Sequence, residues 1–229
     1  MDSNDRTARL AGALYLVTVL TGIFSLIYVP SHINVHGDAS ATVSNIVASE
    51  SLFRLGIAAG AIGYTAFLIL PLVLYKLLSP VNSNIAAVMV ALAVVCVPIY
   101  FVALANQLDV LSLLDGNKIQ GAYATDQLHV RVMELLDAYR NRVFVSEIFW
   151  GLWLFPFGYL IFKSGFLPKV LGVVLMIGCF SYLITYFGEF LLPHVAIPGF
   201  VMWPPAFGEI ATCLWLLIVG VRNPTRSTS

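Results

Sequence analysis

The sequence predicts an all-α, polytopic membrane protein, and two observations lead to this fold class. The first is composition: 59% of the 229 residues are hydrophobic and 10% are charged, with a mean hydropathy of +0.90. A soluble domain has about 25% charged residues, so a chain this apolar does not cover its own surface in water. The second is a series of six apolar stretches, since about 20 helical residues cross a bilayer core about 30 Å thick.

We expect residues 1–229 to form a single domain, most of which consists of six predicted spans. The short connections between the spans contain Pro and Gly residues, which are typical of helix ends and turns. The first span follows the polar head "MDSNDRTARL" without a small-residue cleavage site, so we expect it to be retained and not removed as a signal peptide. The predicted spans are residues 8–29, 55–78, 85–108, 143–162, 169–189 and 200–220.

The connection between the third and fourth spans contains a predicted amphipathic helix. In "DQLHVRVMELLDAYRNRV", Leu128, Val132, Leu135 and Leu136 recur at helical spacing, and charged residues fill the opposite side. We expect this helix to lie at the membrane interface.

The distribution of Lys and Arg predicts that both termini are cytoplasmic. With this orientation the inner side carries seven basic residues: Arg6, Arg9, Lys76, Lys163, Lys169, Arg222 and Arg226. The outer side carries five: Arg54, Lys118, Arg131, Arg140 and Arg142. In total, 12 basic and 12 acidic residues give a formal net charge of zero, which argues against a nucleic-acid partner.

Polar residues within the spans gather in the predicted outer halves. An acid at the centre of a lone helix costs about 3 kcal/mol, so we expect these residues to face other helices. Gly151 and Gly158 lie within about 40° of Glu147 at 100° per residue, and small residues mark close helix contacts in membranes. The sequence therefore predicts an outward-opening polar pocket bounded by Arg54, Glu147, Glu189 and Glu209, with Asn106 near its mouth.

The charges of this predicted pocket do not balance, because one arginine accompanies three glutamates. Either a carboxyl is protonated, or a cation binds, or another basic residue reaches the pocket. A purely structural role is the alternative, in which Arg54 satisfies one or two glutamates and holds the bundle together.

Metal and catalytic motifs are weak or absent. His32 and His36 have an HxxxH spacing, and His194 lies in the predicted outer connection between the fifth and sixth spans. Metal sites need three or four converging ligands, so these histidines are weak candidates. Cys96, Cys179 and Cys213 form no CxxC pair, and the chain has no GxSxG, HExxH or Gly-rich phosphate-binding motif. The sequence implies no cofactor and favours a binding protein over an enzyme.

The segment "SEIFWGLWLFPFGYLIFKSGFLPKVLG", together with "ESLFRLG" and "RLAGALYL", resembles the domain of unknown function 4386 family of bacterial integral membrane proteins. The resemblance covers nearly the whole chain. It implies a multi-span helical protein in the bacterial cytoplasmic membrane, and it implies no activity and no site residues.

The leading functional hypothesis is a membrane protein that binds a small molecule or lipid in the outward-opening pocket. A second hypothesis is a proton- or cation-coupled transporter, although the cytoplasmic halves of the spans offer no polar path and no inverted repeat is evident. A third is a metal-dependent membrane hydrolase, and a fourth is a polar cluster with a purely structural role. The sequence leaves the oligomeric state open.

Overall fold

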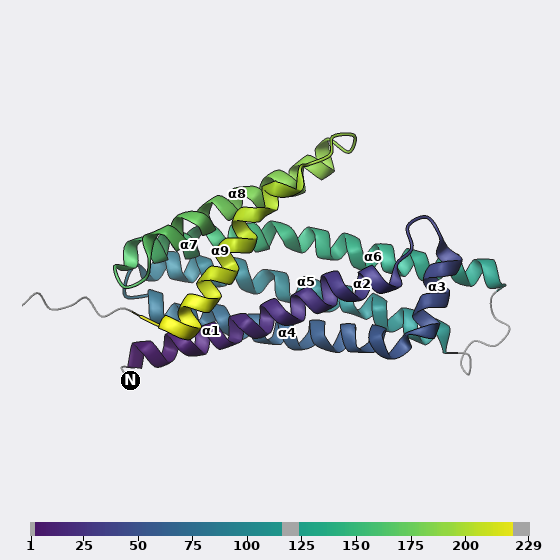
Figure 1. Ribbon diagram of the computed structural model, residues 1–229, viewed down its shortest axis with the longest axis horizontal. Helices are drawn as coiled ribbons and strands as arrows, with labels where there is room; N and C mark the ends of the chain where they lie inside the picture. The colour runs from purple at the N-terminus through teal and green to yellow at the C-terminus, as the bar shows by residue number, and fades with distance from the viewer. Residues whose placement is uncertain (1–2, 116–123, 222–229) are drawn as a thin grey trace, which may run out of the picture. The chain divides into compact units, whose positions relative to one another are not determined.

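The computed structural model describes residues 3–115 and 124–221, and every regular element in these ranges is a helix. Figure 1 shows the order of the helices along the chain. Six helical segments are long and apolar enough to cross a membrane: Ser3–Ile33, Glu50–Leu78, Ser83–Leu114, Thr125–Ser164, Lys169–Leu191 and Gly199–Val219. The predicted all-α, polytopic fold is therefore confirmed. Three basic residues of the predicted charge count, Lys118, Arg222 and Arg226, lie outside the described residues.

The helices of the described residues begin and end as follows. The first four are α1 (Ser3–Gly22), the π-helical η1 (Ile23–Tyr28), α2 (Val29–Ile33) and α3 (Ala39–Ala48). The next four are α4 (Glu50–Leu78), α5 (Ser83–Leu114), α6 (Thr125–Leu152) and α7 (Leu154–Ser164). The last four are α8 (Lys169–Leu191), the 3-10 helix η2 (Gly199–Met202), α9 (Trp203–Leu214) and the π-helical η3 (Trp215–Val219).

Several helices are longer than the apolar stretches that predicted them. The third span continues to Leu114, and the fourth begins at Thr125, well before the predicted residue 143. Hydropathy marks the part of a helix that suits lipid, whereas the helix itself continues until a capping or breaking residue ends it. The predicted amphipathic helix is accordingly present, but as the first half of α6 and continuous with the fourth span.

Pro156 divides the fourth span into two helices. A proline has no N–H to donate to the residue four positions earlier, and its ring clashes with that residue's carbonyl. That earlier residue is Leu152, where α6 ends, and α7 begins at Leu154. The interruption falls beside Trp153, whose side chain is 1% exposed.

The chain forms two units, and several helices pass from one to the other. The first unit comprises residues 1–17, 66–97 and 146–229, and the second comprises residues 18–65 and 98–145. The fifth and sixth spans therefore belong entirely to the first unit, together with parts of the first four.

Aromatic residues fill the core of each unit. In the first unit, the Trp153 indole stacks on Phe157 at 5.1 Å between ring centroids and meets the Phe67 ring edge-on at 5.3 Å. In the second, Tyr64 and Tyr100 stack at 3.5 Å, and Tyr100 is completely buried.

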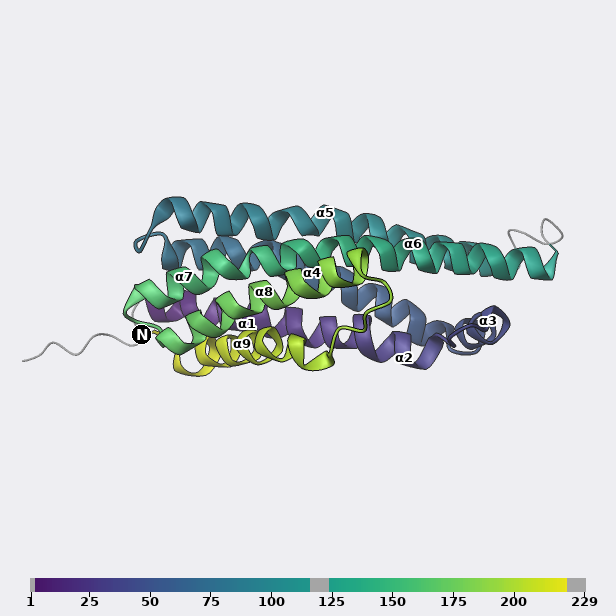
Figure 2. The same ribbon diagram turned by 90° about the horizontal axis from the view of Figure 1, so that it is seen from above.

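Within the first unit, α8 lies between α7 and α9 (Figure 2). Glycines permit these close contacts. A Cβ on Gly158 of α7 would overlap the carbonyl oxygen of Gly172 on α8, and one on Gly178 would lie 3.0 Å from the Cα of Pro205 on α9. The prediction that Gly158 marks a helix–helix contact is confirmed.

Candidate functional site

Glu209 accepts hydrogen bonds from two tyrosines inside the first unit. The Tyr15 hydroxyl on α1 donates to Oε2 of Glu209 at 2.9 Å, and the Tyr182 hydroxyl on α8 donates to Oε1 at 3.4 Å. The carboxyl thus links three helices, α1, α8 and α9. We call these three residues the tyrosine–glutamate cluster.

Close packing of α1 against the last span brings Tyr15 to Glu209. A Cβ on Gly12 would overlap the backbone nitrogen of Leu217, and the Cys213 thiol donates to the Gly12 carbonyl at 3.6 Å. The two helices run in opposite directions, since α1 belongs to the first span and α9 to the sixth. Tyr15, one turn after Gly12 on α1, therefore lies beside Glu209, one turn before Cys213 on α9.

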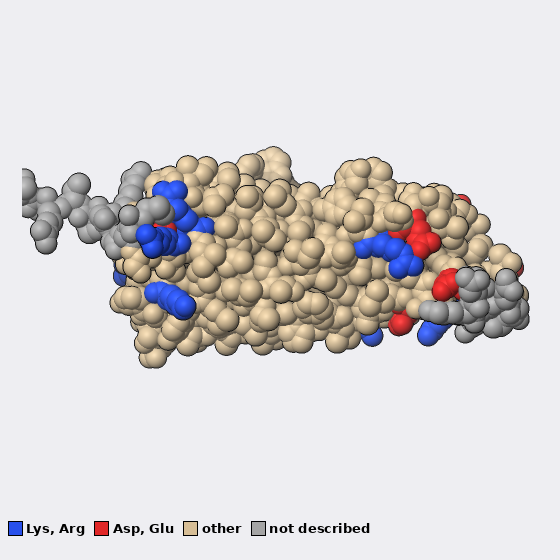
Figure 3. All heavy atoms as spheres, turned by 90° about the horizontal axis from the view of Figure 1, so that it is seen from below, with Lys and Arg blue, Asp and Glu red and all other residues tan. Residues whose placement is uncertain are grey.

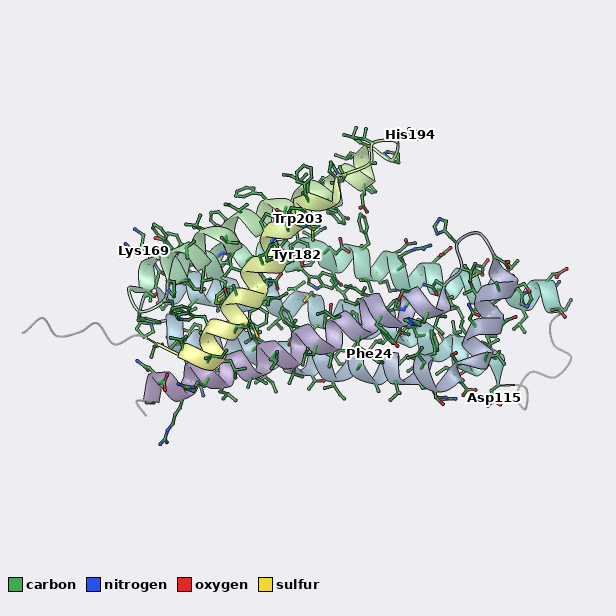
Figure 4. The ribbon with its side chains drawn as sticks, viewed as in Figure 1. Phe24, Asp115, Lys169, Tyr182, His194 and Trp203 are labelled. Atoms are coloured by element: carbon green, nitrogen blue, oxygen red, sulfur yellow. The ribbon has the colours of Figure 1, made fainter. Side chains whose placement is uncertain are left out.

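Tyr182 is positioned by the fourth span. A Cβ on Gly151 would lie 2.7 Å from the Cβ of Tyr182, so this glycine allows α6 and α8 to approach. The Trp150 ring then meets the Tyr182 ring edge-on, with 6.4 Å between centroids. Trp153 lies 6.1 Å from the ring of Tyr15. Two indoles therefore border the two tyrosines of the cluster, and Figure 4 shows where Tyr182 stands on α8.

The other two predicted glutamates belong to the same unit. Glu147 on α6 is half-buried, and Glu189 near the end of α8 is exposed. The Glu147 carboxyl lies close enough to interact electrostatically with Glu189 and with the Tyr182 hydroxyl. Within the described part of this unit, Glu147 has no hydrogen-bond donor. The structure thus places all three glutamates in one unit, where Glu209 accepts a hydrogen bond from Tyr182 and Glu147 interacts with it electrostatically.

No described Lys or Arg of the first unit forms an ion pair with these glutamates. Arg9 instead pairs with Asp5 at 3.2 Å, at the start of α1. Lys169, at the start of α8, lies 5.6 Å above the Phe162 ring. On the face seen in Figure 3, blue Lys and Arg side chains gather at the end of the first unit where the chain begins, and uncharged surface adjoins them.

Arg54 belongs to the second unit and has a local partner. Its Nε donates to Oε1 of Glu50 at 2.6 Å, one helical turn earlier on α4. Their side chains are 59% and 53% exposed, so this is a surface pair. The prediction that Arg54 borders the glutamates stays a prediction, because the two sets of residues lie in different units.

Asn106 also belongs to the second unit, where it is buried. Its amide nitrogen donates to the carbonyls of Val102 and Ala103. Its side-chain oxygen accepts from Nη1 of Arg142 at 2.9 Å. Arg142 is therefore the basic group beside Asn106, a pairing that the sequence did not predict.

Two threonine hydroxyls near the cluster are buried without a hydrogen-bond partner among the described residues: those of Thr185 and Thr212. Thr185 lies one turn from Tyr182 on α8, and Thr212 lies one turn from Glu209 on α9. The Thr212 residue is 1% exposed. The site therefore contains polar atoms that its own side chains leave unsatisfied.

The predicted histidine ligands are divided between the units, with His32 and His36 in the second and His194 in the first. His32 is exposed, with Nδ1 2.8 Å from the Tyr28 carbonyl, and its ring lies 4.2 Å from that of Tyr28. His194 lies in the connection after α8 (Figure 4). The described residues contain no group of three His, Cys, Asp or Glu side chains that could hold a metal ion.

Tyr15 and Tyr182 are the site residues that sequence reasoning missed. Both lie in apolar stretches, where a tyrosine usually indicates an anchor at the membrane interface. A signal for Tyr15 was nevertheless present. Ala8, Ala11 and Tyr15 repeat on one face of the first span, and all three are buried. The small residues on that face allow the approach of another helix, as Gly151 and Gly158 do in the fourth span.

The fold and the site together define a polytopic, all-α membrane protein in which an acidic site, bordered by tyrosines, lies between helices. The chain belongs to the family described as "Domain of unknown function (DUF4386)", whose model matches residues 10–220. It is also 29% identical, over 147 residues, to an uncharacterized protein of Archaeoglobus fulgidus, a match that covers 64% of this chain and 72% of that protein. No solved structure matches the chain. The resemblance found in the sequence is confirmed.

Proposed function

We propose that this membrane protein binds a small molecule or a lipid, whose polar group reaches the tyrosine–glutamate cluster from the outer half of the bilayer. The observation that carries the proposal is the carboxyl of Glu209, which lies between helices, accepts hydrogen bonds from two hydroxyls and forms no ion pair with a described Lys or Arg of its unit. Ionisable residues inside membrane spans are costly, and they usually mark a functional pathway or site.

The neighbouring residues suit such a ligand. Glu147 and Glu189 offer further carboxylate oxygens, and the half-buried Trp150 offers an aromatic ring for an apolar portion. A purely structural link between helices needs only one carboxyl and its donors. Glu147, which has no hydrogen bond in the described part of its unit, adds nothing to such a link. Arg54 and Asn106 have their own partners in the second unit, so the proposal rests on the glutamates.

The proposed location is the bacterial cytoplasmic membrane, with both termini in the cytoplasm. The distribution of basic residues supports this orientation, because Arg6 and Arg9 begin the first span, and Lys163 and Lys169 flank the connection between α7 and α8. Glu189, at the opposite end of α8 from Lys169, then lies on the outer side. Glu209 lies two turns into α9 from the same side.

Native mass spectrometry of the protein, released from its own membranes in mild detergent, tests the proposal. We expect a bound small molecule or lipid on the wild-type protein and a reduced bound fraction on the Glu147→Gln variant. Glu134→Gln is the matched control, since Glu134 is an exposed surface residue of the second unit that pairs with Arg131 at 2.8 Å. Equal retention by all three proteins would contradict a role for the glutamates, and absence of any retained molecule would contradict binding.

A further inference from the structure

We infer that the group bound at this site is an ammonium group, carried by a free amine or by an amine-bearing lipid headgroup. The inference rests on the proposed function and names its ligand class. Four features of the first unit carry it: the balance of charge, the supply of hydrogen-bond donors, two buried hydroxyls without a described partner and the aromatic rings.

The balance of charge favours a cation. Glu147, Glu189 and Glu209 come from three different helices of one unit, and no described Lys or Arg of that unit pairs with them. Glu147 interacts electrostatically with Glu189, and two like charges at one site repel each other. A cationic ligand is attracted to both carboxylates, and these attractions offset the repulsion, whereas an anionic ligand adds a further negative charge.

The supply of donors leads to the same ligand. Tyr15 and Tyr182 direct their hydroxyl protons to Glu209, so the Glu147 carboxyl receives none. An alkylammonium group is a source of donors only, with three N–H groups and no acceptor. It therefore matches a site in which carboxylate oxygens are in excess.

The Thr212 hydroxyl is an observation independent of the carboxyls. It is buried without a hydrogen-bond partner in the described chain, on the turn of α9 that follows Glu209. A buried polar group that lacks a partner is unfavourable in apolar surroundings. Thr185 repeats the pattern on α8, one turn from Tyr182. Hydroxyl oxygens accept N–H donors, so a ligand with several donors can satisfy atoms on both helices.

The aromatic rings complete the match. Trp150 lies one turn beyond Glu147 on α6 and meets Tyr182 edge-on. A cation within about 6 Å of a tryptophan or tyrosine face is attracted by the ring's quadrupole. Carboxylates combined with indole and phenol faces are a recurrent chemistry for ammonium recognition, whereas an anionic group is repelled by both and a neutral group gains no charge attraction.

Three amphiphiles of equal chain length test the inference: dodecylamine, dodecanol and dodecanoate. Each is titrated into the full-length protein in nanodiscs at neutral pH, and binding is followed by tryptophan fluorescence. We expect dodecylamine to bind at least about tenfold more tightly than dodecanol, because the ammonium group adds one charge-assisted hydrogen bond to a carboxylate. Glu147→Gln should remove most of this preference and leave dodecanol affinity unchanged, and Glu134→Gln should change neither.

The outcomes separate the two proposals. Equal affinity for amine and alcohol, or tighter binding of dodecanoate, overturns the ammonium assignment while small-molecule binding stands. Absence of binding by all three overturns both. Glu147→Gln is the variant of choice because it breaks no described hydrogen bond, so a folded protein is expected. Nanodiscs of phosphatidylethanolamine and of phosphatidylglycerol identify the source: weaker dodecylamine binding in the former indicates a lipid headgroup, and equal binding indicates a free amine.

Discussion

Replacing Tyr15 by Phe tests the geometry of the tyrosine–glutamate cluster. The substitution removes one hydroxyl, which donates to Glu209 at 2.9 Å, and it keeps the ring beside Trp153. A hydrogen bond to a charged group contributes about 1.5–3 kcal/mol in soluble proteins, whereas side-chain hydrogen bonds inside membrane proteins average about 0.6 kcal/mol and reach about 1.7. Because Tyr15 is 1% exposed, no water replaces the lost donor readily, and we expect a loss of about 1–2 kcal/mol.

Thermal unfolding in detergent, followed by tryptophan fluorescence, measures this loss. For a chain of this length the expected loss lowers Tm by about 2–8 °C. Tyr182→Phe should lower it less, because its hydrogen bond is longer, at 3.4 Å. Tyr159→Phe is the control, since Tyr159 lies on α7 in the same unit and no hydrogen bond of its hydroxyl is described. A Tyr15→Phe protein as stable as the Tyr159→Phe protein would refute the reasoning.

Three further outcomes follow from the same structure. Gly158→Ala should lower the free energy of unfolding by about 1–3 kcal/mol, because the added Cβ overpacks the contact between α7 and α8. Gly22→Ala should not lower it, because a Cβ there would meet nothing within 4 Å. Equal effects of the two variants in thermal unfolding would contradict the helix contact. Arg54→Leu should change the unfolding free energy by less than about 0.5 kcal/mol, since its described partner forms an exposed i,i+4 pair; a large loss would indicate a further partner. A membrane-impermeant maleimide should label Asp137→Cys in intact cells and Lys163→Cys only after lysis. The native cysteines are buried, so little background labelling is expected from them. The reverse pattern would contradict cytoplasmic termini.

The fold was predictable because hydropathy and helix length are local properties of a sequence. Each of the six predicted spans has a helix, and the glycine spacing around Glu147 identified a face that packs on another helix. Helix ends were less predictable. The third span continues past Asp109 to Leu114 and the fourth begins in charged sequence at Thr125, since a helix ends at capping or breaking residues and not where lipid ends.

The partners of the site residues were not predictable from one sequence. Tyr15 and Glu209 are 194 residues apart, and helical periodicity shows which face of a helix is buried without showing which helix it meets. Arg54 illustrates the opposite case. A partner one turn away, Glu50, was available on the same helix, and a local pair requires no ordering of distant chain. Pairing Arg54 with the glutamates inside the other spans left out Glu50 on its own helix, and ranking residues by formal charge left out the two tyrosines.

The proposal that the glutamates bind an ammonium group is tested most directly by solid-state NMR in lipid bilayers. Dodecylamine labelled with ¹⁵N is added to protein whose glutamate side-chain carboxyls carry ¹³C. A dipolar contact between the amine nitrogen and a glutamate carboxyl is expected in the wild-type and Glu134→Gln proteins, and its loss or marked weakening is expected in Glu147→Gln. Absence of this contact in the wild-type protein, or an equal contact in all three, would contradict ammonium binding at these residues.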